Sequence, residues 1–174
     1  MKTITNIIYS TFAVFTLACF AFAQQAPESV SIRVITTFDY PAIGNEATQP
    51  QKINDTGDIV GGYFDSNGMG RGFVRFRNGR FSAPIVDPND TCNLTEGRGI
   101  NNSGLICGDY ENGGDCLTHG YFLMGANFSE FDVPDSLSTS VIGVNNVGDF
   151  CGDFTDATGL TQGIRQHWRN YNAV

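Results

Sequence analysis

Carboxylate side chains recur in the glycine-rich connections of this chain, and their oxygen atoms are the ligands that Ca²⁺ prefers. Carboxylates on one face of a fold would give a calcium site, or the acid and base of a hydrolase acting on polysaccharide. No D-x-D-x-D-G spacing is present, so ordinary turn chemistry explains the same residues equally well. The calcium candidates are Asp65, Glu111, Asp115 and Asp156, and the connections before the repeated phrases described below add Asp87, Asp90, Glu96 and Asp135.

The sequence contains no motif for catalysis or for a cofactor. Its two histidines, His119 and His167, belong to neither an H-x-x-x-H nor an H-E-x-x-H spacing. No G-x-S-x-G nucleophile elbow and no G-x-x-x-x-G-K-[ST] phosphate loop occurs. His119 begins a predicted strand where the other repeats have Arg71 and Gln162, so we interpret it as a polar residue at a strand edge.

A glycine-rich phrase occurs three times, as INDTGDIVGGYF, INNSGLICGDYE and VNNVGDFCGDFT. The phrases align on Ile53, Ile100 and Val144, at a spacing of about 45 residues. Each is followed by a second signature (RGFV, HGYF or QGIR) and preceded by a third (FDYP, VDP or FDVP). The order of the three signatures predicts three repeat units that start near residues 53, 100 and 144.

The N-x-x-G sequence in each phrase predicts a tight turn between two strands. The asparagine side chain caps backbone amides in such a turn, and the glycine takes the positive φ that the turn requires. A further glycine in the strand that follows leaves room for an aromatic side chain or for another backbone segment. The predicted turn residues are Asn54 and Gly57, Asn101 and Gly104, and Asn145 and Gly148.

We predict an all-β fold in which each unit has four short strands, since no sustained helical period follows residue 24. Four strands in a repeat of about 45 residues are typical of a propeller blade. Three blades are fewer than the four to eight of a closed propeller. The alternatives are therefore an open or partial β-propeller, an assembly of several chains, or a three-fold fold such as a trefoil or prism. Residues 30–41 are predicted as an offset first strand that completes the last unit.

The pattern D-x-P…G-I-N-x-x-G-x-I-V-G-x-Y…H-G-F resembles the bacterial extracellular HAF-type repeats. The His-Ala-Phe triplet of those repeats reads RGF, HGY and QGI in this chain. The resemblance extends over residues 36–166. It implies a secreted or surface protein with propeller-like repeats, and it supplies no reaction and no catalytic residues.

Residues 1–23 are predicted to be a signal peptide, leaving 24–174 as a single repeat domain. The segment has one basic residue, Lys2, then an apolar run that ends in the small-x-small sequence Ala21-Phe22-Ala23. The apolar run is short for a membrane anchor. We therefore expect a secreted, periplasmic or cell-surface protein with no membrane span after cleavage.

Four cysteines follow the predicted signal peptide. Cys107 and Cys151 occupy the same place in successive units, where stacked sheets would hold them about 10 Å apart, too far for a disulfide. We predict that both are buried thiols. Cys92 lies in the connection into the second unit and Cys116 in a loop of that unit, and both connections emerge on the same face. The sequence therefore predicts a Cys92–Cys116 disulfide.

The formal net charge of −8 disfavours nucleic acid as a partner, because phosphates would repel the protein. The leading hypothesis is a secreted, non-catalytic binding or interaction module that presents an acidic loop face to an extracellular protein or glycan. One alternative is a secreted hydrolase acting on polysaccharide. The other is a structural repeat protein that associates with itself through open sheet edges.

Overall fold

The computed structural model describes residues 36–41, 44 and 47–168. The predicted signal peptide and the first part of the predicted offset strand, up to Ile35, lie outside these residues. The chain divides into two units, Met1–Thr36 and Thr37–Val174, and the fold described below belongs to the second unit.

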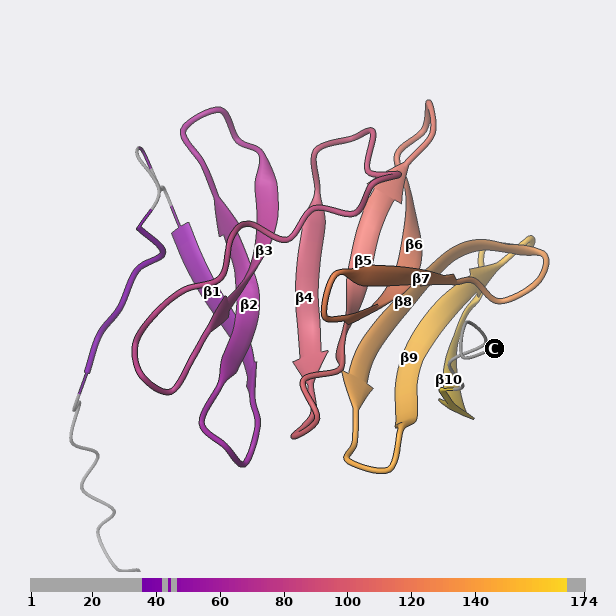
Figure 1. Ribbon diagram of the computed structural model, residues 1–174. Coiled ribbons are helices and arrows are strands. Elements are labelled where there is room, and N and C mark those ends of the chain that lie inside the picture. The colour runs from indigo at the N-terminus through magenta and orange to yellow at the C-terminus, as the bar shows by residue number, and fades with distance from the viewer. Residues whose placement is uncertain (1–35, 42–43, 45–46, 169–174) are drawn as a thin grey trace, which may run out of the picture. The chain divides into compact units, whose positions relative to one another are not determined.

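The described residues form ten β-strands in three antiparallel sheets, which confirms the all-β prediction (Figure 1). None of them forms a helix long and apolar enough to cross a membrane. In each sheet, strands that follow one another in the chain are hydrogen-bonded neighbours. The first sheet contains β1 (Ala47–Ile53), β2 (Ile59–Phe64) and β3 (Gly70–Arg75); the second contains β4 (Thr95–Ile100), β5 (Ile106–Asn112), β6 (Leu117–Met124) and β7 (Asn127–Phe131); the third contains β8 (Ser136–Val144), β9 (Asp149–Asp156) and β10 (Thr161–His167).

Only the second sheet has the four strands that were predicted for every unit. In the first sheet the expected fourth strand is reduced to two isolated bridges, from Phe81 to Arg75 and from Ile85 to Gly72. Pro84 lies between the two bridges and has no N–H to donate, which explains why a regular ladder does not form. In the third sheet β10 is the last strand of the described chain.

The predicted offset strand is wrong where it can be checked, because residues 36–41 form no strand. Tyr40 stacks on Tyr63 of the first sheet, with ring centroids 4.0 Å apart, and also contacts Phe73. This segment therefore covers the first sheet of its own chain instead of completing the third.

The first two strands of each sheet approach each other very closely at one glycine. A β-bulge interrupts the register of β1, β4 and β8 next to the partners of these glycines. A Cβ atom at Gly61, Gly108 or Gly152 would lie 2.2, 2.0 or 1.9 Å from the carbonyl oxygen of Gln49, Glu96 or Ser140. Close backbone approach, one of the two reasons expected from the sequence, therefore explains these glycines.

Apolar cores fill the spaces between successive sheets. One core joins the first and second sheets through residues such as Val60 and Ile100, and another joins the second and third through Cys107 and Val144. The first strand of each following sheet packs on the sheet before it. Ile100 and Val144 are thus 4% and 9% exposed, whereas the aligned Ile53 is 59% exposed. Among the described residues, no strand of the first sheet pairs with a strand of the third, so the sheets form no closed ring. The turns of these two sheets meet where Asn146 Nδ2 donates to Asp55 Oδ2 at 3.3 Å.

Candidate functional site at the two ends of the sheets

The connections between strands gather at two ends of the sheets (Figure 1). We call the end that holds residues 54–57, 101–104 and 145–148 the turn end, because these tight turns join the first and second strands of each sheet. The opposite end, which we call the loop end, holds residues 65–69, 87–94, 113–116, 132–135 and 157–160.

The three asparagines at the turn end cap their own turns, as the sequence predicted. The Oδ1 atom of Asn101 accepts hydrogen bonds from the N–H groups of Ser103 and Leu105, both at 3.0 Å. Asn54 and Asn145 make the equivalent pairs of bonds. The turn glycines have positive φ angles of 88° at Gly57, 82° at Gly104 and 87° at Gly148.

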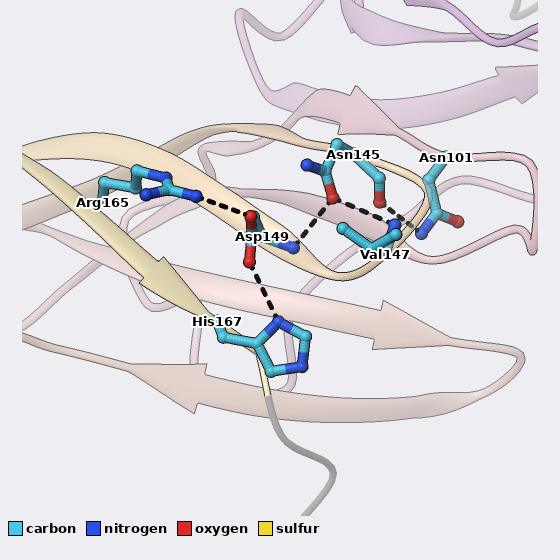
Figure 2. Close-up of polar contacts among 6 residues, drawn as sticks. All are labelled: Asn101, Asn145, Val147, Asp149, Arg165 and His167. Carbon is cyan, nitrogen blue, oxygen red and sulfur yellow. Dashed lines mark hydrogen bonds and ion pairs between the residues drawn. The ribbon is translucent and has the colours of Figure 1, made fainter.

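The same asparagines also connect neighbouring sheets, which the sequence analysis missed. The Nδ2 group of Asn54 donates to the carbonyl oxygen of Asn101 at 3.1 Å, and that of Asn101 donates to the carbonyl oxygen of Asn145 at 3.0 Å (Figure 2). The next residue in each turn adds a parallel row, since the N–H of Asp55 donates to Asn102 Oδ1 and the N–H of Asn102 to Asn146 Oδ1. We call these two rows the amide ladder.

A second recurring contact was also missed. The hydroxyl oxygens of Thr48, Thr95 and Thr139 accept hydrogen bonds from backbone N–H groups at 2.9, 3.1 and 3.0 Å. The three donors, Tyr40, Asp87 and Val133, each precede a proline at the entry to a sheet. Each threonine stands five positions before the residue on which the phrases align, so its signal was present at a fixed spacing.

At the loop end, Cys92 and Cys116 form the predicted disulfide, with their Cα atoms 5.8 Å apart. Hydrogen bonds tie the same two connections together, since the N–H of Thr91 donates to the carbonyl of Glu111 and the N–H of Gly113 donates to Thr91 Oγ1. The connection into the second sheet is therefore fastened to the β5–β6 loop by one covalent link and several polar ones.

Several loop-end carboxylates cap the turns in which they lie. Asp65 Oδ1 accepts from the N–H groups of Asn67 and Met69, and Asp156 Oδ1 accepts from those of Thr158 and Leu160. Asp90 caps the 90–94 turn in the same way. The turn-chemistry explanation given from the sequence therefore has direct structural support.

The four calcium candidates are not brought together. In the part of the chain that the structure describes, one group of three potential metal-binding side chains lies close enough to share an ion: Cys92, Glu111 and Cys116. Two of its three ligand atoms are the sulfurs of the disulfide. The geometry thus gives no reason to prefer a calcium site over turn capping for Asp65, Glu111, Asp115 and Asp156.

Two carboxylates assigned to the acidic face are buried. Glu96 lies in β4 instead of a connection, and its Oε2 atom pairs with an Arg98 nitrogen at 2.6 Å. Asp87 does lie in a connection but is 1% exposed. Its Oδ1 atom accepts from the N–H of Asn89. Its Oδ2 atom is buried and has no hydrogen-bond partner among the described residues. Burial raises the pKa of both side chains, so neither presents its charge to a partner.

A buried polar network joins the second and third sheets. Arg98 Nε lies 3.2 Å from both carboxylate oxygens of Asp109, and Ser140 Oγ donates to Asp109 Oδ2 at 3.0 Å. Burial raises the pKa of Asp109 although the nearby guanidinium of Arg98 acts in the opposite direction. This network satisfies buried charges between sheets and presents no nucleophile.

Each histidine is paired with an aspartate. His119 Nδ1 lies 3.0 Å from Asp132 Oδ2, and the His119 ring stacks on Tyr110 at the strand edge expected from the sequence. His167 Nδ1 lies 3.0 Å from one oxygen of Asp149, whose other oxygen accepts from Arg165 at 2.8 Å (Figure 2). Among the described residues, no hydroxyl or thiol group is hydrogen-bonded to either imidazole.

The prediction for the two free cysteines is half correct. Cys107 is fully buried, and burial raises the pKa of its thiol to about 12. Cys151, which was also predicted to be buried, is exposed. A following sheet covers Cys107, whereas no described residues cover the same face of β9.

No protein-family model, curated protein or solved structure matches this chain. The resemblance to HAF-type repeats stays a prediction, and the function has to be argued from the chain's own residues. The loop end is the part of the described structure in which carboxylates from all three sheets, among them Asp65, Asp115 and Asp135, gather at least partly exposed.

Proposed function

We propose that this protein is a secreted, non-catalytic binding module in which the three sheets act as the blades of an open, propeller-like array. Its contact surface is the loop end, and its partner carries clustered positive charge. The distribution of charge between the connections and the strands is the observation that supports this proposal.

The five described loop-end connections contain no lysine or arginine and six aspartates, and a seventh, Asp156, ends β9 next to the 157–160 turn. The six are Asp65, Asp87, Asp90, Asp115, Asp132 and Asp135. Apart from Asp87, these aspartates are at least partly exposed. An exposed surface of one charge attracts partners of opposite charge and raises their association rate.

The loop end is also held in a fixed shape. The Cys92–Cys116 disulfide and the carboxylate caps of the 65–69, 90–94 and 157–160 turns restrict its connections before any partner arrives. Ordering a flexible loop on binding costs free energy, so a surface ordered in advance binds more tightly. A rigid acidic surface is suited to recognition and needs no catalytic group.

Binding of the purified protein to immobilised probes of different charge tests this proposal. The probes are chitosan oligosaccharides and a basic protein as cations, cello-oligosaccharides as a neutral glycan, and hyaluronan as an anion. We expect binding to the cationic probes alone. This binding should weaken as the salt concentration rises and the Debye length falls from about 10 to 3 Å, because salt then screens the charges. Equal binding to the neutral or anionic probes, or release of shortened oligosaccharides, would overturn the proposal.

A further inference from the structure

Neighbouring sheets contact each other in the same way twice, and among the described residues the third sheet lacks a partner on one side of this contact and the first sheet on the other. Between the first and second sheets and again between the second and third, an asparagine amide of the earlier sheet donates to an asparagine carbonyl of the later one. Asn145 occupies the donor position in the last turn, and no following sheet exists among the described residues. At the other end, Asn54 has the acceptor carbonyl, and no sheet precedes it there.

The side-chain packing shows the same pattern. Gly72 and Gly120 lie against the first strand of the next sheet, since a Cβ at these positions would be 3.3 Å from Gly97 N and 2.8 Å from a methyl carbon of Val141. The aligned Gly163 has only Gly152 O at 4.0 Å. On the first sheet, Ile53 is 59% exposed although its counterparts are buried in inter-sheet cores.

A groove of about 870 Å³ runs beside β10. Aromatic and aliphatic side chains, among them Phe131, Phe150, Ile164 and Trp168, line it. β10 is an edge strand in the described structure, whereas its counterpart β6 pairs with β7. The third sheet therefore offers a second chain both an apolar surface and an open hydrogen-bonding edge.

We propose that a second copy of this chain docks head to tail on the third sheet. Ile53 of the second copy packs on the face of β9 and β10 around Cys151 and Gly163, and its Asn54 carbonyl accepts from the Asn145 amide. Arg165 replaces the apolar Val74 and Phe122 at this face, and its guanidinium pairs with Asp149. Two copies bring together six sheets, within the range of four to eight found in closed propellers.

Sedimentation equilibrium tests the pairing, in a Cys151→Val background so that oxidation of exposed thiols cannot imitate it. Valine is the residue at the equivalent buried position, Val60. We expect the mass of two chains. Gly163→Trp should give the mass of one chain with an unchanged β-sheet circular dichroism spectrum, because a Cβ at Gly163 has its nearest atom 4.0 Å away within a single copy. Gly114→Trp is the matched control: a Cβ there has nothing within 4 Å and lies at the loop end, so pairing should persist.

A second pair of variants tests the amide contact. Two copies joined head to tail in a ring share two such contacts. Asn145→Asp keeps the oxygen that caps its turn and removes the donor from both contacts, so pairing should weaken about 25-fold, the value of two hydrogen bonds. Asn54→Asp removes a donor used within one copy and keeps the carbonyl used between copies, so pairing should be retained. A mass of one chain for the Cys151→Val protein, or continued pairing of the Gly163→Trp variant, would overturn the proposal.

Discussion

The side-chain amide of Asn101 donates a hydrogen bond to the carbonyl oxygen of Asn145, 3.0 Å away in the next sheet, while its own Oδ1 atom closes the turn in which it lies. One side chain therefore both ends a hairpin and joins two sheets. Asn54 has the same two contacts toward Asn101. The asparagines of the repeated phrase stabilise the arrangement of the sheets as well as the turns.

Replacing Asn101 by aspartate should separate these two roles. Asn101→Asp keeps the capping oxygen, removes the donor to Asn145 and places a carboxylate near a carbonyl in a buried position. We expect the free energy of unfolding to fall by about 2 kcal/mol, measured with urea. Asn145→Asp makes the same chemical change in an exposed turn, where we expect a loss below about 0.5 kcal/mol when both variants are measured in the Gly163→Trp background, in which the copies do not pair. Equal losses would show that the bond between sheets contributes nothing.

Gly108→Ala should be one of the most damaging single substitutions in this protein. The new methyl group would lie 2.0 Å from the carbonyl oxygen of Glu96, so β4 and β5 would have to separate. We expect a loss of more than about 3 kcal/mol in thermal unfolding. Gly114→Ala, where a Cβ has no atom within 4 Å, should stay within about 0.5 kcal/mol of the original protein. Tolerance of alanine at Gly108 would contradict the close approach of the two strands.

Removing the disulfide should destabilise the protein and leave its sheets intact. The link joins residues 24 apart, and the chain-entropy account gives about 3 to 4 kcal/mol for such a loop. The double variant Cys92→Ser/Cys116→Ser should unfold at lower urea concentration with an unchanged β-sheet circular dichroism spectrum. Cys151→Val, which introduces the residue found at the equivalent position Val60, controls for the loss of a sulfur and should have no such effect. Full stability of the double variant would contradict this assignment.

Mild acid should stabilise the protein. Burial raises the pKa of Asp109 above its ordinary value of 3.8 and that of Glu96 above 4.5. The folded state then binds protons at a pH where the unfolded state does not, so the free energy of unfolding increases as pH falls through the raised pKa values toward the ordinary ones. The unfolding temperature should therefore rise between pH 7 and about pH 5.

Asp109→Asn is the variant that checks this pH dependence. It removes one of the titrating groups while keeping an oxygen that accepts from Arg98 or Ser140, so the rise in unfolding temperature should become smaller. The same slope in the variant and in the original protein would contradict the assignment to Asp109.

The local features of the fold were predictable because their causes lie within a few residues. An asparagine followed three positions later by a glycine needs only its own backbone to form the turn seen at Asn101. The shared face of the two connections was enough to pair Cys92 with Cys116. In contrast, the cap alone already explains each asparagine, so no separate signal in the sequence indicates the amide ladder.

The errors concern contacts between distant parts of the chain. Cys151 matches the buried Cys107 in position and type, and its exposure depends on whether another sheet follows. Glu96 was placed in a connection because the alignment began at Ile100 and left the start of β4 undefined. Aligning Thr95 with Thr139 would have corrected this, since the threonine lies at the same spacing in each sheet.

The central claim, that the acidic loop end is the binding surface, is tested most directly by removing charge at one end of the sheets and then at the other. Asp115→Asn/Asp135→Asn removes two exposed loop-end charges, and asparagine tolerates the positive φ of 62° at position 135. Asp55→Asn removes one charge at the turn end, where Asn102 and Asn146 already stand in the other turns.

The measurement is the affinity for the cationic chitosan oligosaccharide at low salt. Each exposed ion pair contributes about 0.5 kcal/mol, so the loop-end variant should bind about fivefold more weakly. The Asp55→Asn variant should bind as the original protein does. Unchanged affinity of the loop-end variant, or an equal loss in the turn-end variant, would contradict the account.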